Sequence, residues 1–439
     1  MEMRVNMAQC QIRGGKLMAT AMAIAMVAWA PSSVAENFGD DLASMFTNGE
    51  FDINFRYRYE FVDQDGNGKK SANASTLRTR LIFKTAKWND FDITINMDDV
   101  HTIIASDYNS TRNGKTQYQT VADPKGTDLN IVALTYSGLK NTTLIGGRQR
   151  IKRANDRFIG NVVWRQNEQT YDALSGNFQS QHFKVFYSYV DAVNRVFGPA
   201  DAAPPFNSGF SSDSHLADAA YTLNDTLSFS IYSYFLDLDD RSGSANAFDT
   251  SNQTLGARLT GAPKIGDSWT ITYTAEYAMQ EDYKDSSFNY DADYLLAELG
   301  FKWNWLGVKV GYEVLGSDQS ATKAGVAAPK AFQTPLATLH GHNGWADKFL
   351  STPATGLQDT FLAASAKVAK GTLILVLHDF SADSGSIDYG QEIDFVAKWP
   401  LGKHYSVLGK LAFYDGDKAA AGDLAQDTTK AWLQLTAAF

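Results

Sequence analysis

A strict alternation of apolar and polar residues begins at Phe51 and recurs along most of the chain. In 51–62, aromatic or apolar residues occupy every odd position, and polar or charged residues occupy nearly every even one. This period of two predicts a β-strand whose two faces lie in different environments. The pattern returns in 91–98, 269–277, 295–302, 308–314 and 392–399. The polar faces could contact either the water around a soluble sheet or a wet lumen.

About eighteen such segments are predicted. They start near residues 50, 75, 91, 128, 142, 168, 182, 213, 226, 252, 268, 291, 306, 358, 371, 389, 404 and 429. The alternation is weakest in the fourth to sixth and the fourteenth segments, where Ala, Gly and Thr blur it. Sixteen strands therefore remain possible.

The connections between these segments alternate in length. Short ones fall near 88–90, 138–141, 178–181, 223–225, 262–267, 303–305, 369–370 and 400–403, and the long polar ones include 101–127, 152–167, 192–212 and 316–357. A soluble sandwich gives no reason for every second connection to be tight. The pattern instead predicts an all-β, antiparallel transmembrane barrel with short periplasmic turns and long extracellular loops.

The N-terminal residues have the pattern of a secretory signal. Three basic residues up to Lys16 precede the apolar run 17–30, and the small-residue site Ser33-Val34-Ala35 follows. The run is shorter than the ~20 residues that a membrane-spanning helix needs. We therefore expect a signal peptide at 1–35, a short periplasmic lead at 36–49, too short for a plug, and a single barrel domain at 50–439. The expected location is the outer membrane of a Gram-negative bacterium.

Aromatic residues cluster at the short turns, where an interfacial girdle that contacts lipid is expected. They are Trp88, Trp303, Trp305 and Trp399. The alternative, aromatic residues in the core of a soluble protein, would place them in the middle of strands. Phe439 ends the last alternating segment and is typical of the C-terminal signal that outer-membrane assembly machinery recognises, so we count it with the interface anchors.

Arginine is concentrated in the first half of the chain, where thirteen of the fifteen residues precede position 196. The candidate pore-lining residues are Arg56, Arg58, Arg78, Arg80, Arg148, Arg150, Arg153, Arg157 and Arg165. The first four share the inward parity of two neighbouring strands, and the others lie on or just after the fifth strand. Guanidinium groups stay charged and offer forked donors to carboxylate or phosphate, which predicts a cationic track for anions.

An alternative is that these arginines pair with lumen carboxylates and only make the wall rigid. The candidate partners are Asp52, Glu60, Asp92 and Asp98. Like-charged neighbours on one strand, such as Arg56 with Arg58, instead favour a positive electrostatic potential that attracts anionic solutes.

Several stretches resemble the bacterial alginate export family of outer-membrane barrels. They are Arg56–Glu60 with Asp63–Gly66, Ser75–Leu81, Gly147–Arg150, Arg157–Asn161, Trp164–Asp172, Phe332–His340 and Asn343–Asp347. The resemblance spans most of the mature chain. It implies an eighteen-stranded barrel with an arginine-lined pore that passes an anionic polysaccharide in the type member, and it does not fix the substrate of this chain.

Two long loops are candidates for narrowing the pore. Loop 152–167 is basic and aromatic and could fold inward as a constriction, whereas loop 316–357 could cap the mouth. His340 and His342 in the second loop are read as loop residues and not as metal ligands. The stretch that starts at Asp63 opens like a calcium loop but has Ala74 at its twelfth position, so an extracellular turn is expected. No metal or cofactor is predicted.

Other function classes are disfavoured. Removal of the signal, whose formal charge is +2, takes the net charge from −10 to about −12, which argues against nucleic acid as a partner. The only cysteine is Cys10, upstream of the predicted cleavage site, and the sequence contains neither a Gly-x-Ser-x-Gly nor a His-Glu-x-x-His motif. We therefore expect no catalytic residues, although a barrel hydrolase with a hidden Ser/His or Asp/His set remains an alternative.

These observations favour an outer-membrane channel for passive passage or export of anionic solutes. The expected solutes are carbohydrate-derived, such as alginate-like uronate polymers. A general, non-selective porin is the alternative within the same class. The sequence fixes neither the direction of transport nor the oligomeric state.

Overall fold

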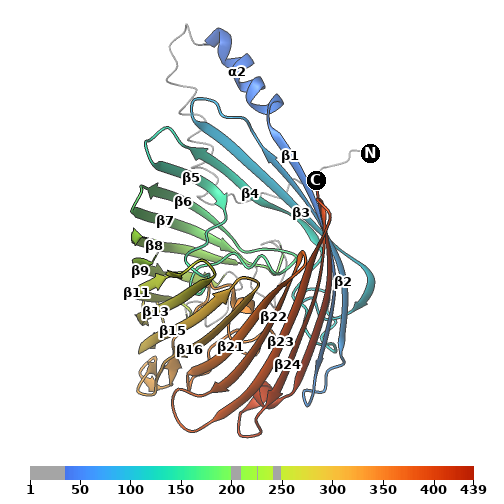
Figure 1. Cartoon of the computed structure of the whole chain (residues 1–439), viewed down its shortest axis with the longest axis vertical. Coiled ribbons are helices and arrows are strands. Elements are labelled where there is room, and N and C mark those ends of the chain that lie inside the picture. Colours follow the sequence, from blue (N-terminus) through green and yellow to red (C-terminus); the bar gives the residue numbers. More distant parts are fainter. Residues whose placement is uncertain (1–34, 199–208, 225, 241–248) are drawn as a thin grey trace, which may run out of the picture.

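The computed structural model describes residues 35–198, 209–224, 226–240 and 249–439. Its dominant feature is a closed antiparallel barrel of eighteen strands. Figure 1 shows the strands following one another around the barrel in chain order. The predicted signal peptide lies almost wholly outside the described residues.

The barrel strands begin within a few residues of the predicted positions. They are β1 (Glu50–Gln64), β2 (Ala72–Lys84), β3 (Phe91–Asp107), β4 (Gly126–Tyr136), β5 (Thr142–Gln149), β6 (Thr170–Gln179), β7 (Phe183–Asn194), β8 (Gly209–Asn224), β9 (Leu227–Leu236), β11 (Asn252–Gly261), β13 (Trp269–Asp282), β15 (Asp291–Trp303), β16 (Leu306–Leu315), β21 (Leu357–Val368), β22 (Gly371–Ser381), β23 (Asp388–Leu401), β24 (Tyr405–Gly416) and β25 (Thr428–Ala438). The four segments with weak alternation form β4, β5, β6 and β21. The prediction of eighteen strands is confirmed.

The remaining elements are short and lie at the strand ends or in the loops. They are β10 (Leu238–Asp240), β12 (Lys264–Ile265), β14 (Phe288–Asn289), β17 (Ser317–Asp318), β18 (Thr322–Lys323), β19 (Val326–Ala327), β20 (Lys330–Ala331), and the 3-10 helices η1 (Leu339–Gly341) and η2 (Gly422–Ala425). Helix α2 (Ala35–Thr47) precedes β1 in the segment expected to be a short periplasmic lead, for which no helix was predicted. No helix in the described ranges is both long and apolar enough to cross a membrane.

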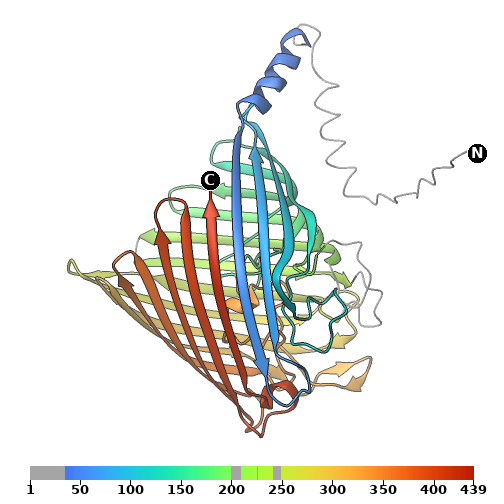
Figure 2. The same cartoon turned by 90° about the vertical axis from the view of Figure 1, so that its right-hand side faces the viewer.

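The barrel closes where its first and last strands meet. β25 pairs antiparallel with β1 from Asn54 opposite Ala438 to Gln64 opposite Thr428. Figure 2 shows the red C-terminal strand beside the blue β1. Phe439 adds one further backbone pair, because its N–H donates to the carbonyl of Ile53 at 2.9 Å and its carbonyl accepts from the N–H of Ile53 at 3.0 Å. Closure of the barrel pairs the backbone N–H and C=O groups of the first and last strands, which an open sheet would leave unpaired in lipid.

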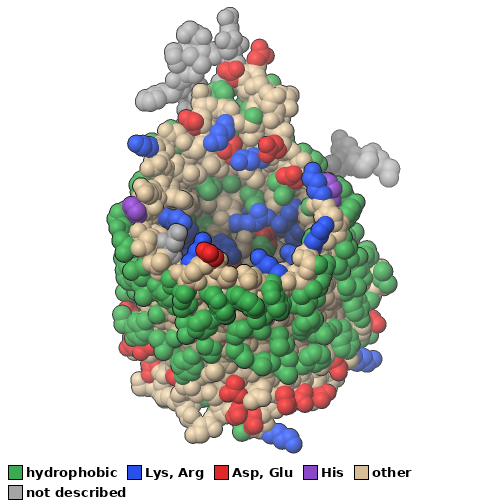
Figure 3. Space-filling model, viewed as in Figure 1, with side chains coloured by type: hydrophobic (Ala, Val, Ile, Leu, Met, Phe, Trp, Pro, Cys, Tyr) green, Lys and Arg blue, Asp and Glu red, His purple; other side chains and the backbone are tan. Residues whose placement is uncertain are grey.

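The two faces of the strands have inverted polarity compared with a soluble protein. On β15, the outward residues Leu295, Leu299 and Phe301 are exposed, whereas Tyr294 and Leu296 face inward and are buried. Figure 3 shows the resulting apolar band around the outside, with Lys and Arg side chains gathered within the opening on the side of α2. An apolar outer band on a closed barrel is the architecture of an outer-membrane protein, which confirms the predicted location.

Aromatic residues occupy the outward parity near the short turns. Trp303 stacks on Trp269 at 5.6 Å between ring centroids, and Trp305 lies in the next turn, 52% exposed. Trp399 covers Gly371, where an added Cβ would lie 2.2 Å from the indole ring. Phe439 stacks on His404 at 5.2 Å. Trp88, half-buried, forms a backbone bridge with Phe91 just before β3. Their roles as membrane anchors and in assembly stay predictions.

Candidate pore lining and constriction

Four arginines on β1 and β2 form the strip that the sequence predicts. Arg56, Arg58, Arg78 and Arg80 lie on the parity whose side chains are buried inside the barrel. Arg56 lies directly opposite Arg78 in the antiparallel ladder. Like charges opposite each other destabilise a strand pair unless another group compensates them. The surroundings of this pair therefore decide what the strip can do.

Three loops fold into the barrel and meet there. We call them loop A (150–169), loop B (316–356) and loop C (108–125). Loops A and B are joined by a parallel bridge between Ile159 and Leu336, in which the N–H of Gly160 donates to the carbonyl of Leu336 at 2.9 Å. The approach at Gly160 leaves no room for a side chain, because an added Cβ would lie 2.3 Å from Thr338 Oγ1. Both loops therefore lie inside the lumen as one packed unit.

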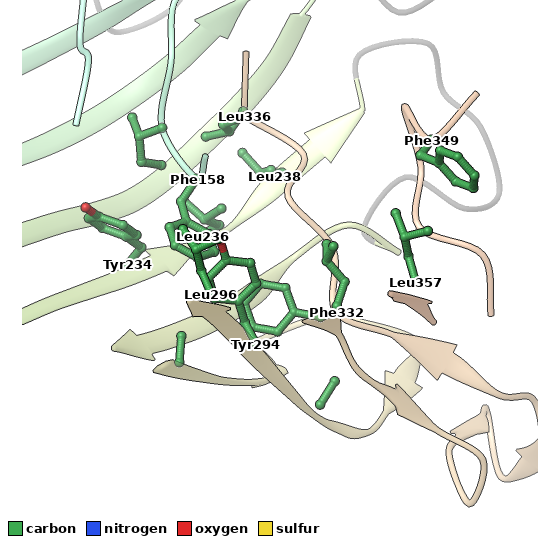
Figure 4. Close-up of a cluster of buried hydrophobic side chains, with 14 of the residues drawn as sticks. Phe158, Tyr234, Leu236, Leu238, Tyr294, Leu296, Phe332, Leu336, Phe349 and Leu357 are labelled. Atoms are coloured by element: carbon green, nitrogen blue, oxygen red, sulfur yellow. The ribbon is translucent and has the colours of Figure 1, made fainter. Parts of the chain in front are cut away.

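An apolar cluster holds this unit against the wall formed by β9, β15 and β16. Phe158 of loop A packs edge-on against Tyr294 at 5.1 Å and also contacts Tyr232 and Phe332, with centroid distances of 5.4 and 5.7 Å. Figure 4 shows Phe158, Tyr294 and Phe332 in this cluster together with Leu336 of loop B. Burial of such aromatic groups stabilises each one by about 1.5–3 kcal/mol.

Loop A spans the lumen through two buried ion pairs on distant strands. Arg157 Nε donates to Glu313 Oε1 on β16 at 2.8 Å, and its Nη2 donates to Asn343 of loop B at 2.9 Å. At the other end, Arg165 Nη1 lies 3.0 Å from Glu60 Oε2 on β1. Arg157 and Glu60 are each only 1% exposed. These arginines therefore anchor the constriction and are not free to bind a solute.

Loop B is pinned to the closing seam by a lysine in an aromatic cage. Lys410 Nζ on β24 lies 3.7 Å from the ring centroid of Trp345 and 4.3 Å from that of Trp164. The same ammonium donates to His340 Nε2 at 2.6 Å, and His340 Nδ1 lies 2.7 Å from Asp347. Trp164 belongs to loop A, so this one cation connects both loops to the wall.

Asp347 is the second anchor of loop B. Its Oδ2 lies 2.7 Å from Lys430 Nζ on β25 and 3.4 Å from Arg165 Nη2 of loop A. Neither Lys410 nor Lys430 was predicted as a site residue from the sequence. Their inward parity was readable, but the pairing of β25 with β1, which brings them beside the arginine strip, was needed to assign them a role.

Burial changes the protonation of the histidine in this network. Desolvation, with the opposing attraction of Asp347, lowers the pKa of His340 to about 3. His340 is therefore neutral at ordinary pH and accepts the hydrogen bond from Lys410. Neither of its ring nitrogens points to a second histidine, and no group of His, Asp or Glu side chains in the described ranges is arranged to hold a metal ion.

Most of the predicted pore-lining arginines have carboxylate partners. Arg80 contacts Asp98 at 2.5 Å and Glu168 at 2.6 Å, and Arg150 pairs with the same Glu168. Arg153 pairs with Asp218 on β8, also at 2.5 Å. With Arg157 and Arg165, these residues fit the structural alternative: they organise the loops and the wall.

Arg148 is placed differently from the others. It lies opposite Val132 and Asp172 in the ladder, on the parity of the exposed Leu144 and Leu174. Its guanidinium pairs with Asp172 at 2.7 Å. The ladder thus places Arg148 on the outward face near the extracellular end of β5 and not in the lumen. The sequence motif alone did not reveal its parity.

Three arginines of the strip remain without a close carboxylate. Within the described ranges, neither Arg56 nor Arg78 has an acidic group within 4.0 Å, and the nearest one to Arg58 is Asp123 at 3.8 Å. Arg56 is occupied, since it donates to the carbonyl groups of Val163 and Arg165.

The other two arginines of this trio have spare donors. Arg78 has one side-chain hydrogen bond, to Asn54 Oδ1 at 2.8 Å, and its buried Nε has no acceptor. Arg58 lies over Trp164 at 4.0 Å and donates to Gln434, while its Nε and Nη1 also lack acceptors. These unpaired donors are buried, and Arg58 Nη1 lies 3.8 Å from Asp123 Oδ2.

No family model matches the sequence, and a search of curated proteins found no relative. Solved structures do match the fold. OccAB2 of Acinetobacter baumannii is 14% identical with a TM-score of 0.67, and OccK9 (OpdG) of Pseudomonas aeruginosa is 13% identical with a TM-score of 0.65. OpdK of Pseudomonas aeruginosa, solved with vanillate, is 10% identical with a TM-score of 0.65. Each match covers 90% of this chain and 99% of the other.

These neighbours correct the family resemblance drawn from the sequence. They are substrate-specific outer-membrane porins of the Occ/Opd group and not members of the alginate export family, so that assignment is wrong. The sequence stretches that suggested the resemblance contain inward arginines and the anchors of loops A and B. A barrel of another group can carry the same residue types in its lumen. At 10–14% identity the likeness shows the fold, an eighteen-stranded porin barrel; the neighbours are channels and not enzymes.

Proposed function

We propose that this chain is a passive outer-membrane channel that favours small organic anions, carboxylates above all. The observation that carries the proposal is the facing pair Arg56 and Arg78, which has no carboxylate within ion-pair distance among the described residues. Two buried guanidinium groups side by side create a positive potential that attracts an anion. A weak site of this kind speeds passage without trapping the solute.

The free donors indicate where the anion binds. Arg78 and Arg58 face the same side of the barrel on adjacent strands, and each retains an unpaired Nε–H. A carboxylate in the lumen beside them would be attracted by both guanidinium charges. Vanillate, found in OpdK, is itself a carboxylate, which agrees with this class of solute.

Small solutes fit the lumen better than a polymer does. Loops A, B and C all enter the barrel, and loops A and B are joined across it by Arg157 and Arg165. A polysaccharide would have to thread past this unit as an extended chain, whereas a small sugar acid or aromatic acid would not. The proposal is therefore limited to monomeric or short anions.

Arg78→Gln tests this assignment. We expect the permeability ratio of anion to cation to fall by about threefold, because one charge with little pairing is lost at the track. Arg78→Lys should keep most of the preference, since it keeps the charge. Arg148→Gln is the matched control, because Arg148 lies on the outward parity. The measurement is the reversal potential of single channels in a planar bilayer under a salt gradient.

A general porin without selectivity is the second candidate. It is favoured by the ion pairs that occupy Arg80, Arg150, Arg153, Arg157 and Arg165. On that account Arg78→Gln and Arg148→Gln would have the same small effect. An unchanged reversal potential in Arg78→Gln would thus contradict the anion track and support the general porin.

A further inference from the structure

A second group of cations lines the lumen wall near the short turns, on other strands than the arginine strip. Lys302 on β15, Lys309 on β16, Lys367 on β21 and Lys398 on β23 all lie on the inward parity, close to the short turns. We call them the lysine patch. Short turns mark the periplasmic side of such barrels, so the patch lies at the periplasmic mouth. Figure 3 shows basic side chains within this opening.

The strand register brings the four lysines together. Lys367 and Lys398 both pair with Thr372 of β22, one from each side. Lys302 pairs with Gly307, which pairs in turn with Ser365, the inward residue next to Lys367. Neighbouring strands lie about 4.8 Å apart, so Lys367 and Lys398 are separated by about 10 Å across the sheet. A single anion with two or more charged groups can span that distance.

Few carboxylates neutralise the positive charge of the lysine patch. Its one carboxylate in the ladder is Glu298, which accepts a hydrogen bond from Lys309. Lys302, Lys367 and Lys398 are exposed to the lumen, and no ion pair or hydrogen bond of their side chains occurs in the part of the chain that the structure describes. Lys302 pairs with Thr270 and Lys367 with Thr372, whereas Lys398 has Leu408 opposite it on β24. The patch is thus a wet surface with a net positive charge.

The patch is separate from the arginine strip. Arg56 lies six residues into β1 and is 8% exposed, whereas Lys302 is one residue from the end of β15 and lies in the open. Lys398 shares a ladder row with Arg58, through Leu408 of β24 and Gln434 of β25. Neighbouring strands lie about 4.8 Å apart, so about 14 Å of wall separates these two residues. The two sites can therefore bind anions independently.

The opposite end of the barrel has the opposite charge. β13 ends in Glu281 and Asp282, and β15 begins with Asp291 and Asp293. Acidic side chains gather at the lower end of Figure 3, away from α2. Acidic side chains thus gather at the extracellular end, whereas the lysine patch lines the wall at the periplasmic end.

We propose that the lysine patch is a second anion-binding site, selective for multivalent carboxylates or phosphates and accessible from the periplasmic side. It rests on the proposed function only in that the barrel must conduct. The site makes the channel asymmetric, because a multivalent anion binds from the periplasmic mouth before it reaches the arginine strip. Monovalent anions, which contact one lysine at a time, bind it weakly.

Side-dependent block by citrate tests the proposal. Single channels are recorded in a planar bilayer, and citrate is added to one chamber at a time. Orientation is read from Ser320→Cys in loop B, which a bulky maleimide added to the extracellular chamber modifies; the native Cys10 precedes the predicted cleavage site. We expect citrate to block from the periplasmic side at about one tenth of the concentration needed from the extracellular side.

The decisive variant is Lys302→Gln/Lys367→Gln/Lys398→Gln. It should raise the blocking concentration about tenfold on the periplasmic side and leave the extracellular side unchanged. Lys370→Gln/Lys403→Gln is the matched control, with two lysines removed from the short turns at the same end. Equal block from both sides in the wild type, or a triple variant that behaves like the control, would overturn the lysine patch. A pore without anion preference but with side-dependent block would overturn only the proposed function.

Discussion

Arg157→Met should release loop A and raise the single-channel conductance. Arg157 is 1% exposed and holds Glu313, Asn343 and Thr334 at the point where loop A crosses to β16. Its removal leaves Glu313 buried beside Tyr294 without a cation. Loss of one partner from a buried ion pair costs about 3–5 kcal/mol, which is enough to favour the undocked loop.

A second variant separates a released loop from general misfolding. Arg157→Met/Glu313→Gln removes both charges, so the buried carboxylate is no longer stranded, and the conductance should return towards the wild-type value. Arg153→Gln is the matched control in the same loop, because its pair with Asp218 is partly exposed and contributes less. If Arg157→Met conducts like the wild type, loop A does not narrow the pore.

Acidification should undock loop B. The pKa of His340 falls from an ordinary value near 6.5 to about 3 when the loop is docked, through desolvation. Below about pH 6.5, His340 therefore binds a proton in the undocked loop but not in the docked loop. The docked state loses about 1.4 kcal/mol for each pH unit below that point, or nearly 3 kcal/mol by pH 4.5. The same stability is fully present above pH 6.5.

The measurement is conductance between pH 7 and pH 4.5. We expect the wild type to show a rise in conductance or in open-state fluctuations as the pH falls, and His340→Gln to lose this response. His404→Gln is the matched control, because His404 lies in an exposed turn and bonds only to the backbone carbonyl of Ala438. A pH response that persists unchanged in His340→Gln would contradict the role of this histidine.

The barrel was predictable from the sequence because lipid and lumen impose opposite demands on alternate residues. Even β21, where Ala and Thr weaken the pattern, starts within one residue of the predicted position. Helix α2 was not predicted, since a single helix of 13 residues before the barrel leaves no repeated pattern. Strand count and the order of turns and loops are local properties that one chain can reveal.

The candidate site was less predictable because it depends on contacts between distant segments. The inward parity of Arg56 and Arg78 was readable, but whether a carboxylate faces them depends on loops A and C. The role of Lys410 required closure of the barrel and the docking of Trp164 and Trp345. The resemblance to alginate exporters was wrong for a related reason. Short arginine motifs indicate a charged lumen but do not distinguish one group of outer-membrane barrels from another.

The reversal potential of the wild-type channel tests whether the lumen selects anions. Purified protein is incorporated into a planar bilayer between potassium chloride solutions of different concentration. An anion-selective lumen should give a reversal potential displaced towards the equilibrium potential of chloride, and reduced conductance when a small aromatic or sugar carboxylate is added. A displacement towards the equilibrium potential of potassium would contradict it.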